Sequence, residues 1–242
     1  PFTQPLTRMR ETIEVVRLAE AGEKLALDGQ QVRLPLPNGE GKALRLSLDT
    51  DDRPLPIYIG ALSPKMLELT GELADGWLGT SFVPEGSATT FESLRAGATR
   101  SNRKLTDLDL CQGAEVAFAR DEKELAAMVD ARRSGLAFSL GGMGSADTNF
   151  YNDAYARQGF AEVATESQRL WLAGDRKAAA QVIPGEMVLA TTLLGTESQV
   201  ADRLRVWADV GISQIRLYPA GKNLEDRLDT LGRALDLVRG LE

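Results

Sequence analysis

The most constraining part of the chain is a 25-letter run, PIYIGALSPKMLELTGELADGWLGT, which extends from Pro56 to Thr80. A short β-branched and aromatic stretch, Ile57 to Ile59, is followed by a turn and then by apolar residues at helical spacing. A second short strand-like stretch begins at Gly76. This order predicts a strand, a helix and a strand. Such a βαβ unit places the segment in a parallel sheet.

The predicted helix of this unit begins at a junction that could bind an anion. Ser63 is a favoured N-cap residue, and Pro64 is favoured at the first helical position. The free amides and the dipole at such a helix start favour negative charge. Lys65 lies in the first turn, where the dipole disfavours a cation, so a nearby negative ligand would explain it. A plain capped helix start that holds no ligand is the alternative interpretation.

Composition narrows the class of protein. A chain of 242 residues is long enough for one α/β barrel or one large domain. The 28 basic and 35 acidic residues give a net charge of −7 without a block of like charge, which argues against nucleic acid as a partner. No apolar run approaches the ~18 residues of a membrane span, and the amino end lacks a signal-peptide pattern, so we expect a cytoplasmic protein. Cys111 is the single cysteine, so the chain cannot form an internal disulfide. Its apolar neighbours in sequence predict a buried thiol.

The chain contains no histidine. This absence removes Ser-His-Asp hydrolysis, Cys-His catalysis and the usual zinc sites, and we expect no metal site. Carboxylate, lysine, tyrosine and hydroxyl chemistry remain, as does chemistry supplied by a cofactor. Hydride transfer on a flavin-like ring is compatible with this composition, because the ring carries the reactive atom. The sequence does not identify a catalytic acid or base.

Further elements follow from periodicity and from capping patterns. A first helix is predicted over 6–21, a hairpin over 32–36 and 43–48, and a helical insertion over 140–185. Strands are predicted to begin near Pro56, Gly76, Leu110 and Ile212. Helix starts are predicted at Asp121, Thr196 and Asn223. The last helix carries an apolar stripe that we expect in the core, formed by Leu224, Leu228, Leu231, Leu235 and Val238.

Three segments resemble one known family. GALSPKMLELTGELADGW resembles the region from strand five to strand six of the luciferase-like flavin or deazaflavin oxidoreductases. Leu189 to Gly221 is similar to the end of the same barrel. Leu140 to Phe160 is similar to the inserted helical segment of the branch that uses the deazaflavin coenzyme F-420. The three segments occur in the family's order and together cover most of the chain.

The resemblance implies a fold of the (β/α)8 TIM-barrel type, in the α/β class. The four predicted strands would correspond to strands five to eight, so the first four would precede Pro1. We therefore expect a partial barrel, with residues 1–242 as a single domain and 140–185 as a helical insertion. Unpaired edge strands promote association. A homo-oligomer or a missing N-terminal half is the expected partner.

The resemblance also implies an activity, namely hydride transfer between coenzyme F-420 and a small organic substrate. The turn after the first strand would line the cofactor, Thr80 and Ser81 would lie at the next strand end, and Lys65 would meet a phosphate. The predicted cofactor-binding residues are Gly60, Ala61, Leu62, Ser63, Lys65, Thr80 and Ser81. Ser63 departs from the glycine usual in the family, and Thr80 has a plain β-propensity interpretation.

Two other readings of function remain open. One is an FMN-dependent monooxygenase, in which reduced flavin activates oxygen. The other is a truncated, non-catalytic subunit or remnant that needs a partner half. Two local features also have two interpretations. The loop from Leu140 to Ser145 is either an anion nest or a hinge, and Tyr218 either faces the ring or caps the core.

Overall fold

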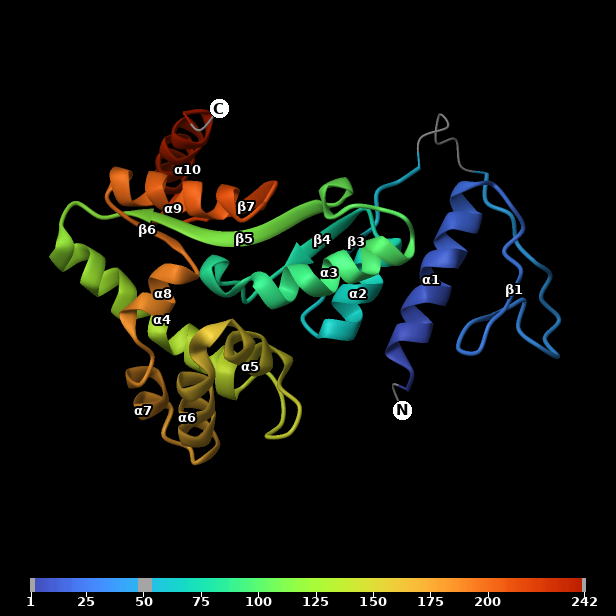
Figure 1. Cartoon of the computed structure of the whole chain (residues 1–242), viewed down its shortest axis with the longest axis horizontal. Helices are drawn as coiled ribbons and strands as arrows, with labels where there is room; N and C mark the ends of the chain where they lie inside the picture. The colour runs from blue at the N-terminus through green and yellow to red at the C-terminus, as the bar shows by residue number, and fades with distance from the viewer. Residues whose placement is uncertain (1–2, 48–53, 241–242) are drawn as a thin grey trace. The chain divides into compact units, whose positions relative to one another are not determined.

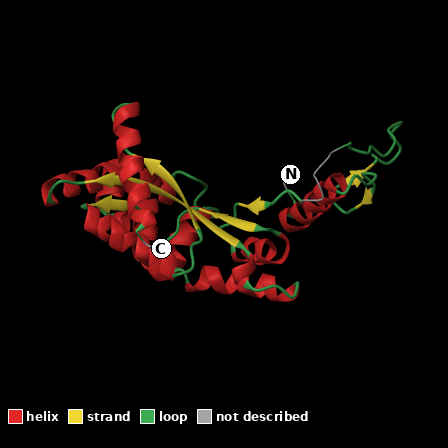
Figure 2. Cartoon of the chain, turned by 90° about the horizontal axis from the view of Figure 1, so that it is seen from above, coloured by secondary structure: helices red, strands yellow, loops and turns green. Residues whose placement is uncertain are grey.

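The computed structural model describes residues 3–47 and 54–240, which divide into two compact units. The first unit comprises Pro1–Ile59, Pro64–Gly76 and Ser93–Leu108, and the second comprises Gly60–Ser63, Trp77–Glu92 and Asp109–Glu242. The chain passes between the units several times, so each contains segments that are distant in sequence. Figure 1 gives the labels of the helices and strands, and Figure 2 separates them by type.

The described part of the first unit contains two whole helices, most of a third and three short strands. Its elements are α1 (Pro5–Glu20), β1 (Leu27–Asp28), β2 (Arg33–Leu34), β3 (Tyr58–Ile59), α2 (Pro64–Leu73), the 3-10 turn η2 (Leu105–Asp107) and most of α3 (Ala88–Arg100). The predicted first helix is confirmed. The predicted hairpin is wrong, because β2 pairs antiparallel with β1 and not with the segment near residue 45, part of which lies outside the described residues.

Two glycines allow helices α2 and α3 to pack closely. A β-carbon at Gly71 would lie 2.0 Å from the carbonyl oxygen of Leu94, and one at Gly97 would lie 1.7 Å from that of Glu68. Only a residue without a side chain fits such backbone contact. On the same helix, Leu67 and Leu69 are buried, so the apolar spacing predicted for α2 faces protein.

The second unit contains most of a parallel sheet. Its strands are β4 (Gly76–Gly79), β5 (Asp109–Phe118), β6 (Leu193–Gly195) and β7 (Gln214–Pro219). The long strand β5 pairs in parallel with β7 from Cys111↔Gln214 to Val116↔Pro219, and with β6 from Val116↔Leu193 to Phe118↔Gly195. Strand β4 is also a neighbour of β5, and β3 precedes β4 in the sheet order. The four predicted strands are confirmed, whereas β6 was not predicted.

The α/β class and the parallel sheet predicted from the sequence are therefore confirmed. Within residues 3–47 and 54–240 this sheet has five strands, and they do not close into a barrel. A closed barrel of this type has eight.

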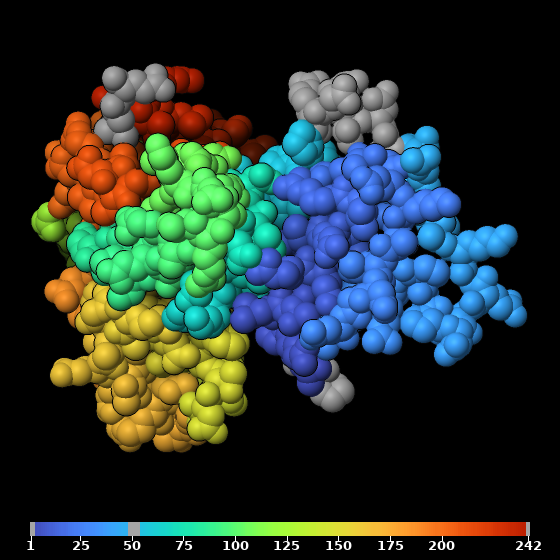
Figure 3. All heavy atoms as spheres, turned by 45° about the vertical axis from the view of Figure 1, so that its right-hand side comes forward, coloured from blue at the N-terminus to red at the C-terminus, as the bar shows by residue number. Residues whose placement is uncertain are grey.

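Helices make up the rest of the second unit. They are the turn η1 (Pro84–Gly86), α4 (Glu122–Gly141), α5 (Phe150–Tyr155), the kinked segment η3 (Ala156–Phe160), α6 (Ala161–Leu172), α7 (Arg176–Gln181), α8 (Gly185–Ala190), α9 (Glu197–Asp209) and α10 (Leu224–Arg239). The predicted caps are confirmed, since the side chains of Asp121, Thr196 and Asn223 each accept a backbone N–H of the following turn. Figure 3 shows α5 to α7, in yellow to gold, gathered in one region of the surface.

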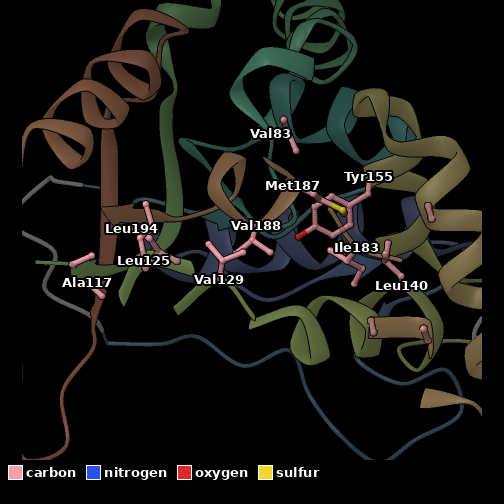
Figure 4. Close-up of a cluster of buried hydrophobic side chains, with 14 residues drawn as sticks. Val83, Ala117, Leu125, Val129, Leu140, Tyr155, Ile183, Met187, Val188 and Leu194 are labelled. Atoms are coloured by element: carbon pink, nitrogen blue, oxygen red, sulfur yellow. The ribbon is translucent and has the colours of Figure 1, made fainter. Parts of the chain in front are cut away.

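An apolar core holds helices α4 to α8 together (Figure 4). Its fully buried members include Leu140 of α4, Ala164 of α6 and Met187 of α8. A second, aromatic cluster lies where the sheet meets α9. The ring centroid of Phe82 lies 5.8 Å from those of Trp77 and Trp207, in edge-to-face geometry. Cys111 is buried, as predicted.

The expectation for the last helix is wrong. Leu224, Leu228, Leu235 and Val238 of α10 are exposed, and Leu231 is half-buried. The helix packs on α9, β5 and β7 through a neighbouring face that contains the buried Ala234. None of the described helices is long and apolar enough to cross a bilayer.

Candidate functional site

A cavity of about 440 Å³ opens beside the carboxyl end of β4, within the second unit. Residues of the strand end, of β5, of α4 and of the segment before β6 line it. The polar lining residues are Thr80, Ser81, Glu115, Arg132, Ser134, Ser139, Tyr155, Thr191 and Thr192. Ligand sites of parallel α/β proteins lie at this end of the strands. The cavity is thus the candidate site.

The loop that leaves β4 is held in an uncommon conformation. Ser81 has a φ of 51°, in the left-handed region that residues other than glycine rarely adopt. The Gln158 Nε2 group donates to the carbonyl oxygen of Ser81 at 2.7 Å, and the backbone N–H of Val83 donates to Gln158 Oε1 at 2.7 Å. Strain of this kind persists only where the surrounding structure enforces it. Here the insertion supplies that enforcement.

Tyr155 forms part of the cavity wall beside Ser81. Its side chain is buried, and burial raises the pKa of the Tyr155 phenol to about 12, against an opposing influence of the Ser81 hydroxyl. A phenol with this pKa is neutral at physiological pH. Tyr155 therefore offers a hydroxyl group and not a charge to anything bound in the cavity.

An ion pair provides the charge in the wall. Arg132 of α4 donates from Nε to Glu115 Oε2 at 3.0 Å and from Nη2 to Glu115 Oε1. Its Nη1 group donates to the carbonyl oxygen of Met128 at 2.7 Å. The guanidinium is thus fixed by two elements, β5 and its own helix. Because the Glu115 carboxylate neutralises the guanidinium, the pair brings two charged groups but no net charge. Together with the hydroxyl groups, the pair suits a ligand with polar substituents.

The predicted site residues divide into two groups. Thr80 and Ser81 line the cavity, whereas Gly60, Ala61, Leu62, Ser63 and Lys65 are not among its lining residues. The turn after β3 is nevertheless ordered within the same unit. The carbonyl oxygen of Ala61 accepts a hydrogen bond from Trp77 Nε1 at 3.0 Å, and that of Leu62 accepts one from Arg157 Nη2 at 2.8 Å. A β-carbon at Gly60 would approach only the carbonyl oxygen of Leu78, at 3.8 Å.

Lys65 has an acidic partner on its own helix. Helix α2 begins at Pro64 as predicted, and Lys65 Nζ lies 3.0 and 3.1 Å from the two carboxylate oxygens of Glu68. Hydrogen bonds from Arg100 and then from Lys65 lower the pKa of the Glu68 carboxyl. The ion pair by itself accounts for a cation in the first turn, without a bound anion.

A comparison with models of known protein families covers all or most of each of the three segments that resemble the luciferase-like oxidoreductases. Residues 1–214 match the family described as luciferase-like monooxygenase. The chain belongs to this family. The resemblance predicted from the sequence is therefore confirmed.

Several luciferase-like relatives can be compared along most of the chain. A Mycobacterium tuberculosis protein, provisionally named as a coenzyme F-420-dependent oxidoreductase, is 34% identical over 221 residues, which cover 88% of this chain and 63% of that protein. The 5,10-methylenetetrahydromethanopterin reductase of Methanolobus tindarius is 29% identical over 236 residues, covering 97% of this chain and 67% of the reductase. The chain thus spans about two thirds of the length of these relatives or slightly less.

A solved structure supports the same fold. The coenzyme F-420-dependent tetrahydromethanopterin reductase of Methanopyrus kandleri superimposes with a TM-score of 0.67, covering 97% of this chain and 61% of that chain. The sequences are 22% identical, so this likeness concerns the fold alone. It places the described strands in the luciferase-like arrangement.

Sequence reasoning missed several residues of the luciferase-like chain that shape the cavity. They are Glu115, Arg132, Tyr155, Gln158, Thr191 and Thr192. A signal existed for Glu115, which is the one charged residue between Leu110 and Ala119, in a stretch whose only other polar side chain is that of Gln112. Arg132 and Gln158 lie in helical segments far from the strand end in sequence, and their local patterns carry no such signal. Of the two interpretations of Tyr218, exposure of about half of its surface (53%) argues against capping the core.

Proposed function

We propose that the chain binds coenzyme F-420 and contributes to hydride transfer between this deazaflavin and a small organic substrate. The observation that carries the proposal is the polar cavity at the end of β4, which contains Thr80 and Ser81 in a chain of the luciferase-like family. The 34% identity to a relative named for coenzyme F-420 supports the choice of cofactor.

The residues of the cavity fit a coenzyme of this class. Hydroxyl groups from four segments and the guanidinium of Arg132 surround a volume of about 440 Å³. Cofactor sites commonly hold a ligand in a cavity of this size with a few convergent polar groups. When bound, the deazaflavin ring would supply the hydride chemistry. The chain's own part would be to bind and orient: Thr80 and Ser81 would donate or accept hydrogen bonds, and Arg132, whose charge Glu115 balances, would offer further N–H donors.

The remaining predicted residues belong to the same proposal. Gly60, Ala61, Leu62 and Ser63 would approach the cofactor through backbone, since Gly60 has no side chain to block that approach. Lys65 would contact a phosphate only by sharing its ammonium group with Glu68. Lys65→Ala should then weaken cofactor binding by roughly 1 to 3 kcal/mol, as expected for a charged hydrogen bond. An unchanged dissociation constant would limit Lys65 to its ion pair.

A titration tests the proposal and its two rivals. Purified protein would be titrated with coenzyme F-420 and, in parallel, with FMN, while absorbance and fluorescence of the ring are followed. The proposal predicts a dissociation constant in the micromolar range or lower for coenzyme F-420, and a weakening of roughly two- to tenfold in Thr80→Val and Ser81→Ala. A spectral change with FMN and none with the deazaflavin would favour the monooxygenase.

The second alternative is that the chain is a non-catalytic part that needs a partner half. It is motivated by the length of the relatives, since the chain spans 63% of the Mycobacterium tuberculosis protein. Light scattering performed alongside the titration distinguishes it. Binding by a well-behaved monomer would contradict the need for a partner. Binding that appears only in an oligomer would support the need for a partner. The same titration would then show whether that oligomer binds coenzyme F-420 or FMN.

A further inference from the structure

Gln158 connects the helical insertion to the loop that carries Thr80 and Ser81. Its side chain is buried, with an exposure of 5%, and three hydrogen bonds satisfy it. Its Oε1 atom accepts from the Val83 N–H at 2.7 Å, and its Nε2 group donates to the carbonyl oxygens of Ser81 at 2.7 Å and Ala154 at 2.8 Å. One amide therefore fixes both ends of the three-residue stretch 81–83.

The stretch requires this support because of its backbone. Ser81 has a φ of 51°, a left-handed conformation that is strained for a residue other than glycine. The side chains of Thr80 and Ser81 line the cavity from this loop. A change in the φ of Ser81 would turn the Ser81 side chain relative to that of Thr80 and so alter the spacing of the two hydroxyl groups. The geometry of the proposed ligand contacts thus depends on what holds residues 81–83.

A kink between helices α5 and α6 explains how Gln158 reaches the loop. Within η3 (Ala156–Phe160) the helical dihedral angles are lost at Gln158, with φ −99° and ψ 20°, and at Gly159, with φ 101°. Glycine tolerates such a positive φ, so the chain changes direction here at little cost. The break releases the Gln158 side chain from the helix surface toward residues that lie 75 and 77 positions away in sequence.

We propose that Gln158 is a positioning residue of the candidate site: it pre-forms the loop 80–83 so that Thr80 and Ser81 are placed for the ligand before binding. The inference deepens the proposed function and rests on it. Gln158 is not among the residues that line this cavity, so it acts through the loop. Holding a strained loop in its bound form spares the ligand the ordering cost.

The insertion provides a matched control in Asn152. This amide is also buried, with an exposure of 9%, and its Nδ2 group donates to the carbonyl oxygens of Leu140 at 2.9 Å and Ala164 at 2.8 Å. These contacts join α4, α5 and α6, and the hydrogen bonds of Asn152 do not extend to residues 80–83. Gln158→Met and Asn152→Leu each replace a buried amide by an apolar side chain of similar size. Only the first variant removes the support of the loop.

The experiment combines a binding titration with thermal unfolding. Gln158→Met should raise the dissociation constant for coenzyme F-420 by about tenfold or more. Asn152→Leu should lower the melting temperature to a similar extent but leave the dissociation constant within about twofold of the wild-type value. Equal effects on binding in the two variants, or a folded Gln158→Met with unchanged affinity, would overturn the inference.

Hydrogen exchange of the wild-type protein keeps the inference testable if Gln158→Met does not fold. The Val83 amide should already be protected in the free protein, because Gln158 accepts its hydrogen bond. Protection that arises only after coenzyme is added would contradict pre-formation of the loop. This measurement also separates the two proposals: a wild-type protein that binds neither coenzyme F-420 nor FMN refutes the proposed function, whereas the exchange rate of Val83 still reports on the loop.

Discussion

Helices α9 and α10 share the same pattern of capping and apolar spacing, but their apolar faces have opposite environments. Each begins at a side-chain N-cap, and each carries apolar residues at helical spacing. In α9 these residues are buried, with exposures of 2% for Leu204 and 1% for Trp207. In α10 the corresponding residues face outward, and Leu228 has an exposure of 58%. Periodicity therefore identifies which face of a helix is apolar, but it does not identify what covers that face.

The difference arises from the neighbours of the two helices. The apolar face of α9 lies on β6 and on the aromatic cluster of the strand-end loop, where Trp207 meets Phe82. Helix α10 packs on α9 and on the strands β5 and β7 (Figure 1). Its buried residue is Ala234, a small residue beside the apolar stripe. The apolar stripe of α10 is therefore not covered by the described part of the chain and remains exposed.

The same substitution in the two helices gives the largest predicted contrast. Leu204→Ala should reduce the free energy of unfolding by about 2 to 5 kcal/mol, because it removes a buried side chain and leaves a cavity. Leu228→Ala should change it by only about 0.5 kcal/mol, as is usual for exposed positions. Urea-induced unfolding of both variants measures the contrast. Similar losses in both would mean that another chain or another copy covers α10 in solution.

These two helices also show which parts of the fold were predictable from the sequence. The caps at Thr196 and Asn223 are contacts between residues three positions apart, so local sequence specifies them. The strands that begin near Gly76 and Leu110 contain enough consecutive apolar residues to be recognised. Strand β6 has three residues, and its partner Val116 lies far away in sequence, so no local pattern predicted it.

The candidate site divides in the same way. Thr80 and Ser81 were predicted because they follow a strand, and strand ends form the sites of parallel sheets. Arg132 approaches Glu115 only because α4 packs back beside β5, and this packing depends on contacts along the whole helix. Lys65 shows the opposite limitation. Its position in the first turn suggested an anion, but its nearest partner, Glu68, was already present one turn away on the same helix.

Glycine substitution sharpens the comparison at a smaller scale. Gly232 lies within α10, and a β-carbon at this position would meet nothing within 4 Å. Gly232→Ala should therefore raise the free energy of unfolding by roughly 0.5 to 1 kcal/mol, because alanine restricts the unfolded chain and favours a helix. Thermal and urea unfolding would detect the gain. Gly71→Ala is the matched control and should destabilise, since its β-carbon would collide with the backbone of α3. A loss of stability in Gly232→Ala would show that the outer face of α10 is covered.

Ion pairs on the two helices provide the smallest predicted contrast, and it depends on pH. Arg203 of α9 donates from Nη2 to Glu85 Oε2 at 2.9 Å and from Nη1 to Glu85 Oε1, whereas Arg239 of α10 contacts Asp236 within its own helix at 2.9 Å. The hydrogen bonds from Arg203 lower the pKa of the Glu85 carboxyl. Because this folded-state pKa lies below that of the unfolded chain, the stabilisation is present above the unfolded value of about 4.3 and is lost as the pH falls through the lowered value.

Glu85→Gln should accordingly cost roughly 0.5 kcal/mol near neutral pH, a modest figure because the Glu85 side chain is 55% exposed and water screens the pair. The difference from the wild-type protein should shrink toward zero as the pH falls below about 4. Asp236→Asn, whose pair is exposed on both sides, should change stability less than Glu85→Gln does at neutral pH. Urea unfolding at a series of pH values compares the two variants. A difference for Glu85→Gln that persists unchanged into acid would mean that its neutral side chain, and not the lost charge, alters the packing beside α9.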